Sequence, residues 1–523
     1  KQKIIPTILS RCQIFDFKRI GLVEIVNHLH YVAEQEKINV EQDALHVIAQ
    51  KSDGSLRDSL SILDRLSSFD DAITYQNVID NLNILDHEYY FQLTKFILIS
   101  DISNVLLLFN KILENGFDGH HFIEEAINVG ASGVIVSSKK DAIKFKGLYV
   151  HDTLKALFDL ANFSRKRFNG KIIAITGSNG KTSTKDMANI IFSKFGKSHA
   201  TSGNNNNIIG LSLTLSRLNK SYDYCILELG MSNKQELKKL SIISRPDFVI
   251  ITNVSKNHLE NFKSEEEIAL AKSEIFHGLK ENGIILLNYD DRWFNFLKKI
   301  ALTYTNKIIP FGLKKSILTI QETNDNIIIQ CKKFKLNLNH LPKYLVINLI
   351  SILSLIKYLN LNLLKIKSTL SKLSPTEGRG NIFKIRTNNN EMITIINDAY
   401  NSSPESLNES LKNLYINSSN KYVLIIGDML ELGPKSLSYH KKLIPIIKKI
   451  NPRTLLTIGN ISQVISDNLK NNIFCKHFKN VTLLKKNFEK LINHNDIIFI
   501  KGSNSIGLYS FCNYLKENYE IGE

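Results

Sequence analysis

Cysteine is scarce in this chain of 523 residues: five are present, widely spaced and without a CxxC pair. An odd number of scattered thiols argues against a disulfide framework and against a zinc site. We therefore interpret the cysteines as small buried side chains in a reducing compartment: Cys12, Cys225, Cys331, Cys475 and Cys512.

Long apolar runs are lacking as well. A helix that crosses a membrane needs about 20 mainly apolar residues, whereas the longest candidate, Leu345–Ile356, is shorter and is interrupted by Asn348. The N-terminus also lacks the basic, apolar and small-residue regions of a signal peptide. We therefore expect a cytoplasmic protein without membrane insertion.

Acidic residues are outnumbered, with 67 Lys and Arg against 50 Asp and Glu, a net charge of +17. The balance differs along the chain, because residues 1–118 hold 11 basic and 17 acidic residues, a net of −6, which leaves +23 for the rest. The excess is spread out rather than clustered, so nucleic acid is not an expected partner. A diffuse positive field would still favour anionic nucleotide substrates.

The pattern of apolar residues also changes near residue 118. Before it, apolar positions recur at three- and four-residue spacing, which predicts helices over Ile20–Glu36, Gln42–Ser52 and Leu56–Leu66. From about residue 131, short β-branched segments alternate with helical patterns, which predicts βαβ units and a mainly parallel sheet. The expected strands are Gly133–Ser137, Lys171–Thr176, Tyr224–Glu228, Phe248–Asn253 and Gly283–Asn288.

The first segment contains two short stretches, IPTILSRC at residues 5–12 and DGSLRD at residues 53–58. They resemble the lid and collar region of the clamp-loader gamma/tau subunit of bacterial DNA polymerase III. The resemblance implies that Arg11 reaches a neighbouring subunit's ATP site and that Arg57 senses nucleotide on its own subunit. A guanidinium suits both roles, since it stays charged and forks onto phosphate oxygens. Clamp-loader subunits are therefore candidate partners of residues 1–115, although this chain lacks that family's phosphate loop.

A glycine-rich loop lies between the expected strand Lys171–Thr176 and an expected helix, Thr184–Phe195. Backbone N–H groups of such a loop close around phosphate oxygens at a helix N-terminus. Lys181 would neutralise the β- and γ-phosphates, and the Thr182 hydroxyl would reach magnesium. The generic phosphate loop has Gly where this chain has Ile175, so the match is to the shorter Thr-Gly-x-x-Gly-Lys-Thr form. The predicted ATP-binding residues are Gly177, Ser178, Asn179, Gly180, Lys181, Thr182 and Ser183.

That shorter loop is shared by Mur ligases and folylpolyglutamate synthetases, and residues 117–523 resemble the Mur ligase family. The resemblance implies that Thr182, Glu228, His258 and Lys272 hold two magnesium ions. Lys272 would do so after carbamoylation, which turns a cation into an anionic oxygen ligand. The motif FDGHHFI at residues 117–123 resembles both families, and we interpret it as the junction of two unrelated sequences.

Further motifs of the Mur ligases imply contacts with nucleotide and substrate. Asn288 matches the adenine contact, and Arg379 matches a phosphate contact before the last domain. The stretch TSGNNNNIIG at residues 201–210 resembles the lining of the muramoyl-peptide site. The implied substrate contacts are Thr201, Asn204, Asn206, Asn207 and Tyr400.

The last domain resembles the branch of the family that adds D-alanyl-D-alanine. Residues 397–404 (NDAYNSSP) keep Asp398, Tyr400 and Asn401 but have Asn397 where that branch has Asp. The stretch GDMLELG at residues 427–433 favours the same branch over its relatives. The implied catalytic residues are Lys181, His258, Lys272, Asp398 and Asn401.

The expected fold is α/β: a P-loop central domain with a parallel sheet and a C-terminal Rossmann-like domain, preceded by an all-α segment. The expected domains are a clamp-loader-like segment (1–118), a truncated N-terminal substrate domain (119–167), a central ATP-binding domain (168–377) and a C-terminal domain (378–523). The implied activity is ATP-dependent addition of D-alanyl-D-alanine to UDP-N-acetylmuramoyl-tripeptide through an acyl phosphate.

Three interpretations remain open from the sequence. The first is this ligase, weakened by loss of the part of its first domain that helps to hold the UDP end of the substrate. The second is a related amide ligase with another acceptor. The third is a non-enzymatic chain that acts in DNA replication by binding clamp-loader subunits through residues 1–115.

Overall fold

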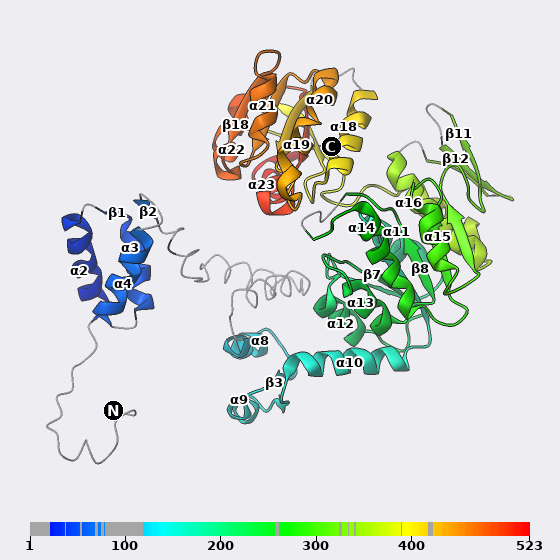
Figure 1. Cartoon of the computed structure of the whole chain (residues 1–523), viewed down its shortest axis with the longest axis horizontal. Helices are drawn as coiled ribbons and strands as arrows, with labels where there is room; N and C mark the ends of the chain where they lie inside the picture. The colour runs from blue at the N-terminus through cyan, green and yellow to red at the C-terminus, as the bar shows by residue number, and fades with distance from the viewer. Residues whose placement is uncertain are drawn as a thin grey trace. The chain divides into compact units, whose positions relative to one another are not determined.

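The computed structural model describes residues 21–36, 38–52, 55–67, 72–74, 78, 119–256, 261–323, 327–332, 334–338, 341–388, 390–416 and 422–522. It divides into two compact units, Lys1–Val150 and His151–Glu523. Their helices and strands are labelled in Figure 1.

In the first unit, three helices pack around a small hydrophobic core. They are α2 (Leu22–Gln35), α3 (Gln42–Lys51) and α4 (Leu56–Ser67), close to the bounds expected from apolar periodicity. The core includes Ile25, Leu29, Leu45, Ile48 and Leu63. The strands β1 (Asn39–Val40) and β2 (Ala72–Ile73) pair in parallel, so the segment is helical but not purely α. Arg57 is exposed on α4, and Arg11 lies outside the described residues.

Residues 119–150 form a small α/β layer. Its elements are η1 (Gly119–Phe122), α8 (Ile123–Asn128), β3 (Ile135–Val136), α9 (Lys139–Lys144) and β4 (Leu148–Tyr149), with β3 parallel to β4. Among its described hydrophobic side chains, only Ile123 and Val136 are buried. So little burial is consistent with part of a larger layer rather than a domain with its own core.

The second unit begins with α10 (Thr153–Arg167), whose N-cap Asp152 accepts hydrogen bonds from the Leu154 and Lys155 N–H groups. A six-stranded parallel sheet follows, in the order β10-β9-β8-β5-β7-β6. The strands are β5 (Lys171–Thr176), β6 (Ser198–Ala200), β7 (Tyr224–Glu228), β8 (Phe248–Ile251), β9 (Ile284–Asn288) and β10 (Ile308–Phe311).

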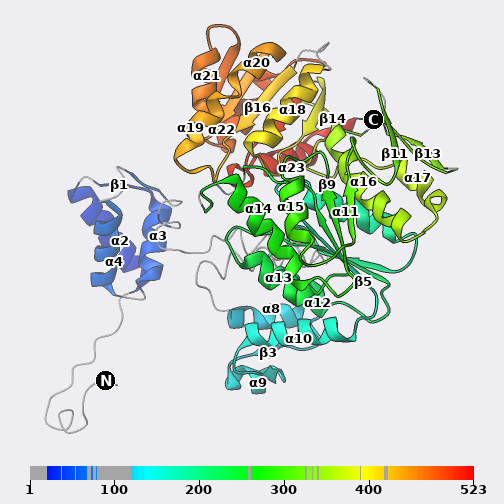
Figure 2. The same cartoon turned by 45° about the vertical axis from the view of Figure 1, so that its right-hand side comes forward.

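Both faces of this sheet are covered. Along β5, Ile173 and Ile175 belong to one hydrophobic cluster, and Ile172 and Ala174 belong to another on the opposite face. The first cluster is completed by α11 (Lys181–Phe192) and α16 (Lys343–Tyr358), and the second by α12 (Ile208–Ser216), α13 (Glu236–Ser244), α14 (Glu265–Ser273) and α15 (Phe294–Ala301). These helices can be followed in Figure 2. Burial on both faces explains the continuous apolar runs of the strands.

A three-stranded antiparallel sheet adds to the first cluster, through Ile329, Phe334 and Leu336. Its strands are β11 (Thr319–Glu322), β12 (Ile327–Cys331) and β13 (Phe334–Asn337). The short elements η3 (Leu363–Ile366) and α17 (Lys367–Leu370) lead from α16 toward the last domain. No helix in the described part of the chain is both long enough and apolar enough to span a membrane.

The last domain is built on a seven-stranded mixed sheet in the order β18-β17-β16-β19-β15-β14-β20. Its strands are β14 (Asn381–Arg386), β15 (Met392–Asn397), β16 (Tyr422–Gly427), β17 (Thr454–Ile458), β18 (Phe474–Phe478), β19 (Ile497–Lys501) and β20 (Glu520–Gly522). β14 runs antiparallel to both β15 and β20, and the other neighbouring pairs are parallel. The helices are α18 (Pro404–Ile416), α19 (Ser436–Lys441), α20 (Ile444–Ile450), α21 (Gln463–Leu469), α22 (Val481–Asn487) and α23 (Leu508–Asn518). The α/β class expected from the sequence is confirmed.

Candidate active site

The predicted nucleotide residues gather where β5 lies between β7 and β8. Strand order changes direction at β5, and ligands of open parallel sheets bind beyond the carboxyl ends of the strands at such a position. The loop after β5 carries residues 177–180, β7 ends at Glu228, and β8 leads into Thr252 and Asn253. Three predicted site segments are therefore brought together by the topology.

The phosphate loop is held in a conformation that requires glycine. Gly177 and Gly180 have φ values of 153° and 81°. A Cβ at Gly177 would collide with the Thr252 hydroxyl, and one at Gly180 would collide with the Asn348 amide. Gly180 is also the N-cap of α11, so the helix dipole and its free N–H groups face the loop.

The segment after β8 supports this loop by hydrogen bonds. The Asn179 N–H donates to Asn253 Oδ1 at 2.9 Å, and the Thr252 hydroxyl donates to the Asn179 carbonyl at 2.6 Å. Ser255 N–H donates to Ser178 Oγ at 2.8 Å. Ser178 and Asn179 are thereby fixed by side chains rather than left to shape themselves around a ligand.

Lys181 lies over the loop that it was predicted to serve. Its ammonium donates to the Gly177 carbonyl at 2.8 Å and to the Ser178 carbonyl at 3.3 Å. Burial lowers the pKa of Lys181, while the Glu228 charge raises it and the Arg379 charge lowers it. An anionic phosphate would compensate the burial that now opposes its charge.

Glu228 is a buried carboxylate with one oxygen to spare. Its side chain is 1% exposed. Oε1 accepts a hydrogen bond from Asn206 Nδ2 at 2.9 Å, whereas Oε2 has no partner among the described residues. A buried, unpartnered carboxylate oxygen, on a side chain whose charge acts on Lys181, fits a hard divalent cation, which prefers oxygen ligands.

Lys272 is buried on α14, with 3% of the residue exposed. Burial lowers the pKa of the Lys272 amine well below its usual value, and the Lys181 charge lowers it further. No carboxylate pairs with this amine within the described residues. A neutral buried amine is the form that reacts with carbon dioxide, so the residue fits the predicted carbamoylation.

Arg379 connects the last domain to the phosphate loop. Its guanidinium donates to the Thr182 hydroxyl at 2.8 Å, and it lies 4.2 Å from the centroid of the Tyr400 ring. Burial raises the pKa of the Tyr400 hydroxyl, whereas the Arg379 charge lowers it. The predicted phosphate contact and the predicted substrate tyrosine are therefore direct neighbours.

Asp398 follows β15 and is paired with a lysine that the predicted set omits. Lys501, at the end of β19, has a side chain that is 4% exposed and lies 2.8 Å from Asp398 Oδ2. It also donates to the Asn401 carbonyl at 3.2 Å. Asn401 is exposed, and its Oδ1 accepts from the Ser402 N–H at 2.8 Å. Only the three-dimensional pairing of β15 with β19 shows that Lys501 belongs to this group.

The 201–207 segment supplies structural contacts beside its predicted substrate role. Thr201 Oγ1 accepts from the Glu228 N–H at 3.0 Å, and Asn206 Nδ2 donates to the Glu228 carboxylate. Asn207 is exposed and caps α12, since its Oδ1 accepts from the Gly210 N–H at 2.8 Å. Asn204 has a buried Oδ1 without a partner among the described residues, so its amide oxygen can accept from a ligand.

The remaining predicted residues have no direct contact with the phosphate loop that can be described, or lie outside the described residues. The Asn288 amide donates to the Thr252 carbonyl at 2.9 Å and accepts from the Asp290 N–H at 3.0 Å, so it links the site to β9. Ser183 is buried in the first turn of α11. His258 lies outside the described residues. Within the described part of the chain, no three His, Cys, Asp or Glu side chains form a preformed metal cluster.

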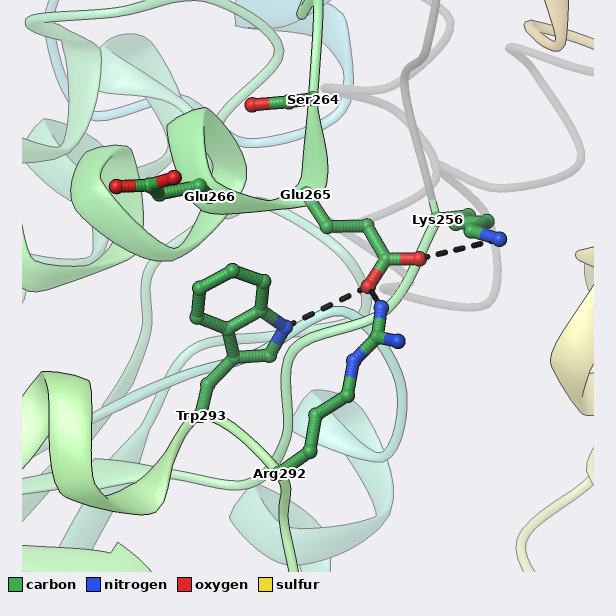
Figure 3. Close-up of a pocket in the computed structure, with 6 residues that line it drawn as sticks. All are labelled: Lys256, Ser264, Glu265, Glu266, Arg292 and Trp293. Carbon is green, nitrogen blue, oxygen red and sulfur yellow. Dashed lines mark hydrogen bonds and ion pairs between the residues drawn. The ribbon is translucent and has the colours of Figure 1, made fainter.

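A pocket of about 510 Å³ lies at the N-terminal end of α14 (Figure 3). Its central group is Glu265, which accepts from Trp293 Nε1 at 3.4 Å and pairs with both Lys256, at 3.4 Å, and Arg292. The remaining lining residues are Ser264 and Glu266. Both cations are thus already paired with Glu265.

Comparison with known families agrees with this geometry. The Mur ligase middle domain matches residues 175–355, and the Mur ligase, glutamate ligase domain matches residues 382–504. Curated relatives named UDP-N-acetylmuramoyl-tripeptide--D-alanyl-D-alanine ligase extend over more of the chain. The one from Rickettsia prowazekii is 33% identical over 413 residues, which cover 77% of this chain and 91% of the relative. The chain belongs to the Mur ligase family.

Other relatives of this Mur ligase carry the same name. The protein of Buchnera aphidicola subsp. Baizongia pistaciae is 35% identical over 79% of this chain and 90% of its own length. That of Escherichia coli is 31% identical over 79% of this chain and 91% of its own length. ATP dependence and the ligase class, both expected from the sequence, are confirmed.

Solved structures give the same fold. MurF from Acinetobacter baumannii has a TM-score of 0.63 and 25% identity, and covers 77% of this chain and 88% of its own. MurF from Thermotoga maritima, solved in complex with ADP, has a TM-score of 0.62 at 23% identity, and covers 77% and 92%. Residues 24–72 match a different family, the DNA polymerase III clamp loader subunit, ATPase lid domain. The chimeric character expected from the sequence is therefore confirmed.

Proposed function

We propose that this Mur ligase joins D-alanyl-D-alanine to UDP-N-acetylmuramoyl-tripeptide at the expense of ATP, in the synthesis of peptidoglycan precursor. The substrates are those in the names of its relatives. The observation that carries the proposal is that Lys181 contacts the phosphate loop, close to the charges of Glu228 and of Arg379, which itself contacts Thr182.

The chemistry is phosphoryl transfer followed by amide formation. The terminal carboxylate of the tripeptide attacks the γ-phosphorus of ATP, so an acyl phosphate forms and ADP leaves. The amine of D-alanyl-D-alanine then attacks the acyl carbon, loses a proton and displaces phosphate. Little covalent chemistry falls to the protein, so its contribution is positioning and charge stabilisation.

The chain's residues divide this work between its two domains. Lys181 and the N–H groups of the phosphate loop neutralise and orient the transferred phosphate. Arg379 brings a second cation from the start of the last domain, and the Asp398 carboxylate, held by Lys501, lies near Asn401 and Tyr400 where the acceptor would enter. Contact between the two domains therefore completes the site.

Magnesium would be held by oxygen ligands on the central domain and would offset charge on the phosphates. Thr182 and Glu228 supply such oxygens directly. Lys272 supplies them after its neutral amine attacks carbon dioxide, which forms an N–C bond and releases one proton. His258 completes the predicted set.

The proposal is tested by phosphate release from ATP, with UDP-muramoyl-tripeptide and D-alanyl-D-alanine added separately and together. We expect release that requires both substrates. Nucleotide binding without release would show that the ligase activity is absent. Exchanging the acceptor for single amino acids tests the related-ligase alternative, which requires an acceptor other than the dipeptide to be preferred.

The truncated first domain leads to a weaker affinity for the UDP end of the substrate. Residues 119–150 bury little apolar surface, as expected for a layer that lacks some of its elements. The alignment with the Rickettsia relative covers 91% of that protein and leaves 9% of it unmatched. We expect a KM for UDP-muramoyl-tripeptide above that of a relative with a complete first domain, whereas the KM for ATP should be similar. Equal KM values for the muramoyl substrate would contradict this.

The match of residues 24–72 to a clamp-loader lid supports a second proposal for that segment alone. The three helices α2, α3 and α4 have their own core, so the segment can present a folded surface to clamp-loader subunits. Co-purification of replication subunits with the whole chain, lost on deletion of residues 1–115, would support it. Absence of such subunits would contradict it.

A further inference from the structure

A second lysine lies on the phosphate-binding helix, one turn after Lys181. Lys185 is buried, with a side chain that is 4% exposed. Its ammonium lies 2.7 Å from Asp186 Oδ1, and it donates to the Thr201 carbonyl at 3.0 Å and to the Gly203 carbonyl at 3.2 Å. It does not point toward the phosphate loop that Lys181 covers.

These contacts occupy the whole donor capacity of the side chain. An ammonium has three N–H donors, and three acceptors surround this one. A buried ammonium without partners would be strongly unfavourable, so the two loop carbonyls are held toward it. Lys185 therefore acts on the protein rather than directly on a ligand.

The loop that Lys185 holds is connected to the metal-binding side of the site. Thr201 Oγ1 accepts from the Glu228 N–H, and Asn206 donates its amide to Glu228 Oε1. The Asn206 carbonyl accepts from the Gly230 N–H at 2.9 Å, just beyond β7. Movement of the 201–206 loop would therefore displace both its own asparagines and the Glu228 carboxylate.

We propose that Lys185 is a positioning residue that fixes the 201–206 loop for the muramoyl peptide and aligns Glu228 through it. This rests on the proposed function, which assigns the loop to that substrate. One buried side chain thus joins the helix that binds phosphate to the loop that binds the acyl donor. Both substrates of the first chemical step are then oriented from the same helix.

The test removes the charge of Lys185 while keeping a side chain of similar length. In Lys185→Met the loop carbonyls lose their donor, and we expect the KM for UDP-muramoyl-tripeptide to rise by about tenfold or more, as for other residues that orient ligand-binding groups. Binding of a non-hydrolysable ATP analogue in the absence of magnesium, measured by calorimetry, should be unchanged, because Glu228 then has no metal to hold. Lys185→Arg keeps the charge and the N–H donors, and should restore most of the affinity.

A structural readout accompanies the kinetics. Amide hydrogen exchange of residues 201–206 should become faster in Lys185→Met, and should not change in Lys194→Met, whose lysine is exposed beyond the same helix. Asp186→Asn, which keeps an oxygen acceptor beside Lys185, should show a smaller effect than Lys185→Met. It also provides a folded variant if the methionine variant is unstable.

The outcomes separate the two proposals. A Lys185→Met protein with a lower melting temperature but unchanged KM and unchanged exchange in the loop would overturn the positioning role. If the wild type does not bind UDP-muramoyl-tripeptide, the proposed function fails, and the substrate role of Lys185 fails with it. Faster loop exchange in Lys185→Met would, in that case, still support its hold on the loop.

Discussion

Lys272 and Glu228 show how single residues in this site are held in states that water would not favour. The lysine amine is buried beside another cation, and the glutamate is buried with one oxygen free. Neither arrangement helps folding, because desolvated charged or basic groups without partners are unfavourable. Both arrangements are explained if contacts with bound phosphate and metal offset the unfavourable free energy of burying these groups.

We predict that Lys272→Met is stable but inactive. The substitution removes the amine that would become a metal ligand, so phosphate release should fall to background, while a neutral side chain of similar length suits the buried position. Incubation of the wild type with ¹³C-bicarbonate should give a carbamate signal in its NMR spectrum that is absent from the variant. Lys298→Met, on the exposed face of α15, is the matched control.

The pH dependence of stability follows from the same residue. The folded-state pKa of Lys272 lies below the unfolded value, which is about 10.4. The unfolded chain then binds more protons between the two values, so its free energy of unfolding rises with pH across that window. Stability is fully present above the unfolded pKa and is lost as pH falls toward the folded one. The free energy of unfolding can be measured by urea titration at several pH values, in solution free of carbon dioxide. Its slope against pH should be shallower for Lys272→Met than for the wild type, and equal slopes would contradict the burial argument.

At the scale of single elements, α12 combines a structural and a predicted functional residue in Asn207. Its side chain caps the helix, and its position in the 201–210 stretch predicts a substrate contact. We expect Asn207→Ala to lower the free energy of unfolding by about 1 kcal/mol, measured by urea denaturation. Asn207→Asp should keep the cap and the stability.

The same pair of variants tests the substrate contact separately. Asn207→Asp removes the amide N–H donors without removing the cap, so a raised KM for UDP-muramoyl-tripeptide would support the contact. Unchanged KM in a stable Asn207→Asp protein would leave Asn207 with the cap alone.

The sequence predicted elements better than contacts. β5 and β7 have the bounds expected from their apolar runs, because the residues of each run pair in the sheet up to its last member, Thr176 or Glu228. Helix α11 was expected from Thr184 but begins at Lys181, since the left-handed Gly180 ends the loop earlier. The grip of Lys185 on the Thr201 and Gly203 carbonyls depends on how the helix packs against the loop, and no local pattern shows this.

The same limit applies in the last domain. The motifs around Asp398 and Gly427 were recognisable, but the omission of Lys501 from the predicted site reflects its distance in sequence. It pairs with Asp398 because β15 and β19 are adjacent, although many residues separate them. Asn397 is buried and its Nδ2 has no partner within the described residues, and nothing in the structure explains the replacement of the family's Asp.

At the scale of the whole molecule, we propose that catalysis depends on Arg379, which links the last domain to the central one. Its guanidinium contacts Thr182 and the Tyr400 ring together, which a lysine cannot reproduce, because an ammonium lacks the planar fork. We predict that Arg379→Lys lowers kcat by about 100-fold, as loss of one oriented donor to developing charge commonly does. Its stability should be close to that of the wild type.

The control for this prediction is Arg386→Lys, an exposed arginine on β14 of the same domain. It should retain the kcat of the wild type in the phosphate-release assay. A wild-type kcat in Arg379→Lys would show that the contact with Thr182 does not serve the reaction.

The central claim is that this chain activates a carboxylate of a muramoyl peptide by phosphorylation and joins it to D-alanyl-D-alanine. The most direct measurement uses UDP-muramoyl-tripeptide with ¹⁸O in its terminal carboxylate, together with ATP and the dipeptide, followed by mass spectrometry. We predict a product heavier than the labelled substrate by the dipeptide minus H₂¹⁸O, and phosphate that carries one ¹⁸O atom from the carboxylate. Phosphate without ¹⁸O, or ATP cleavage without the joined product, would contradict the account.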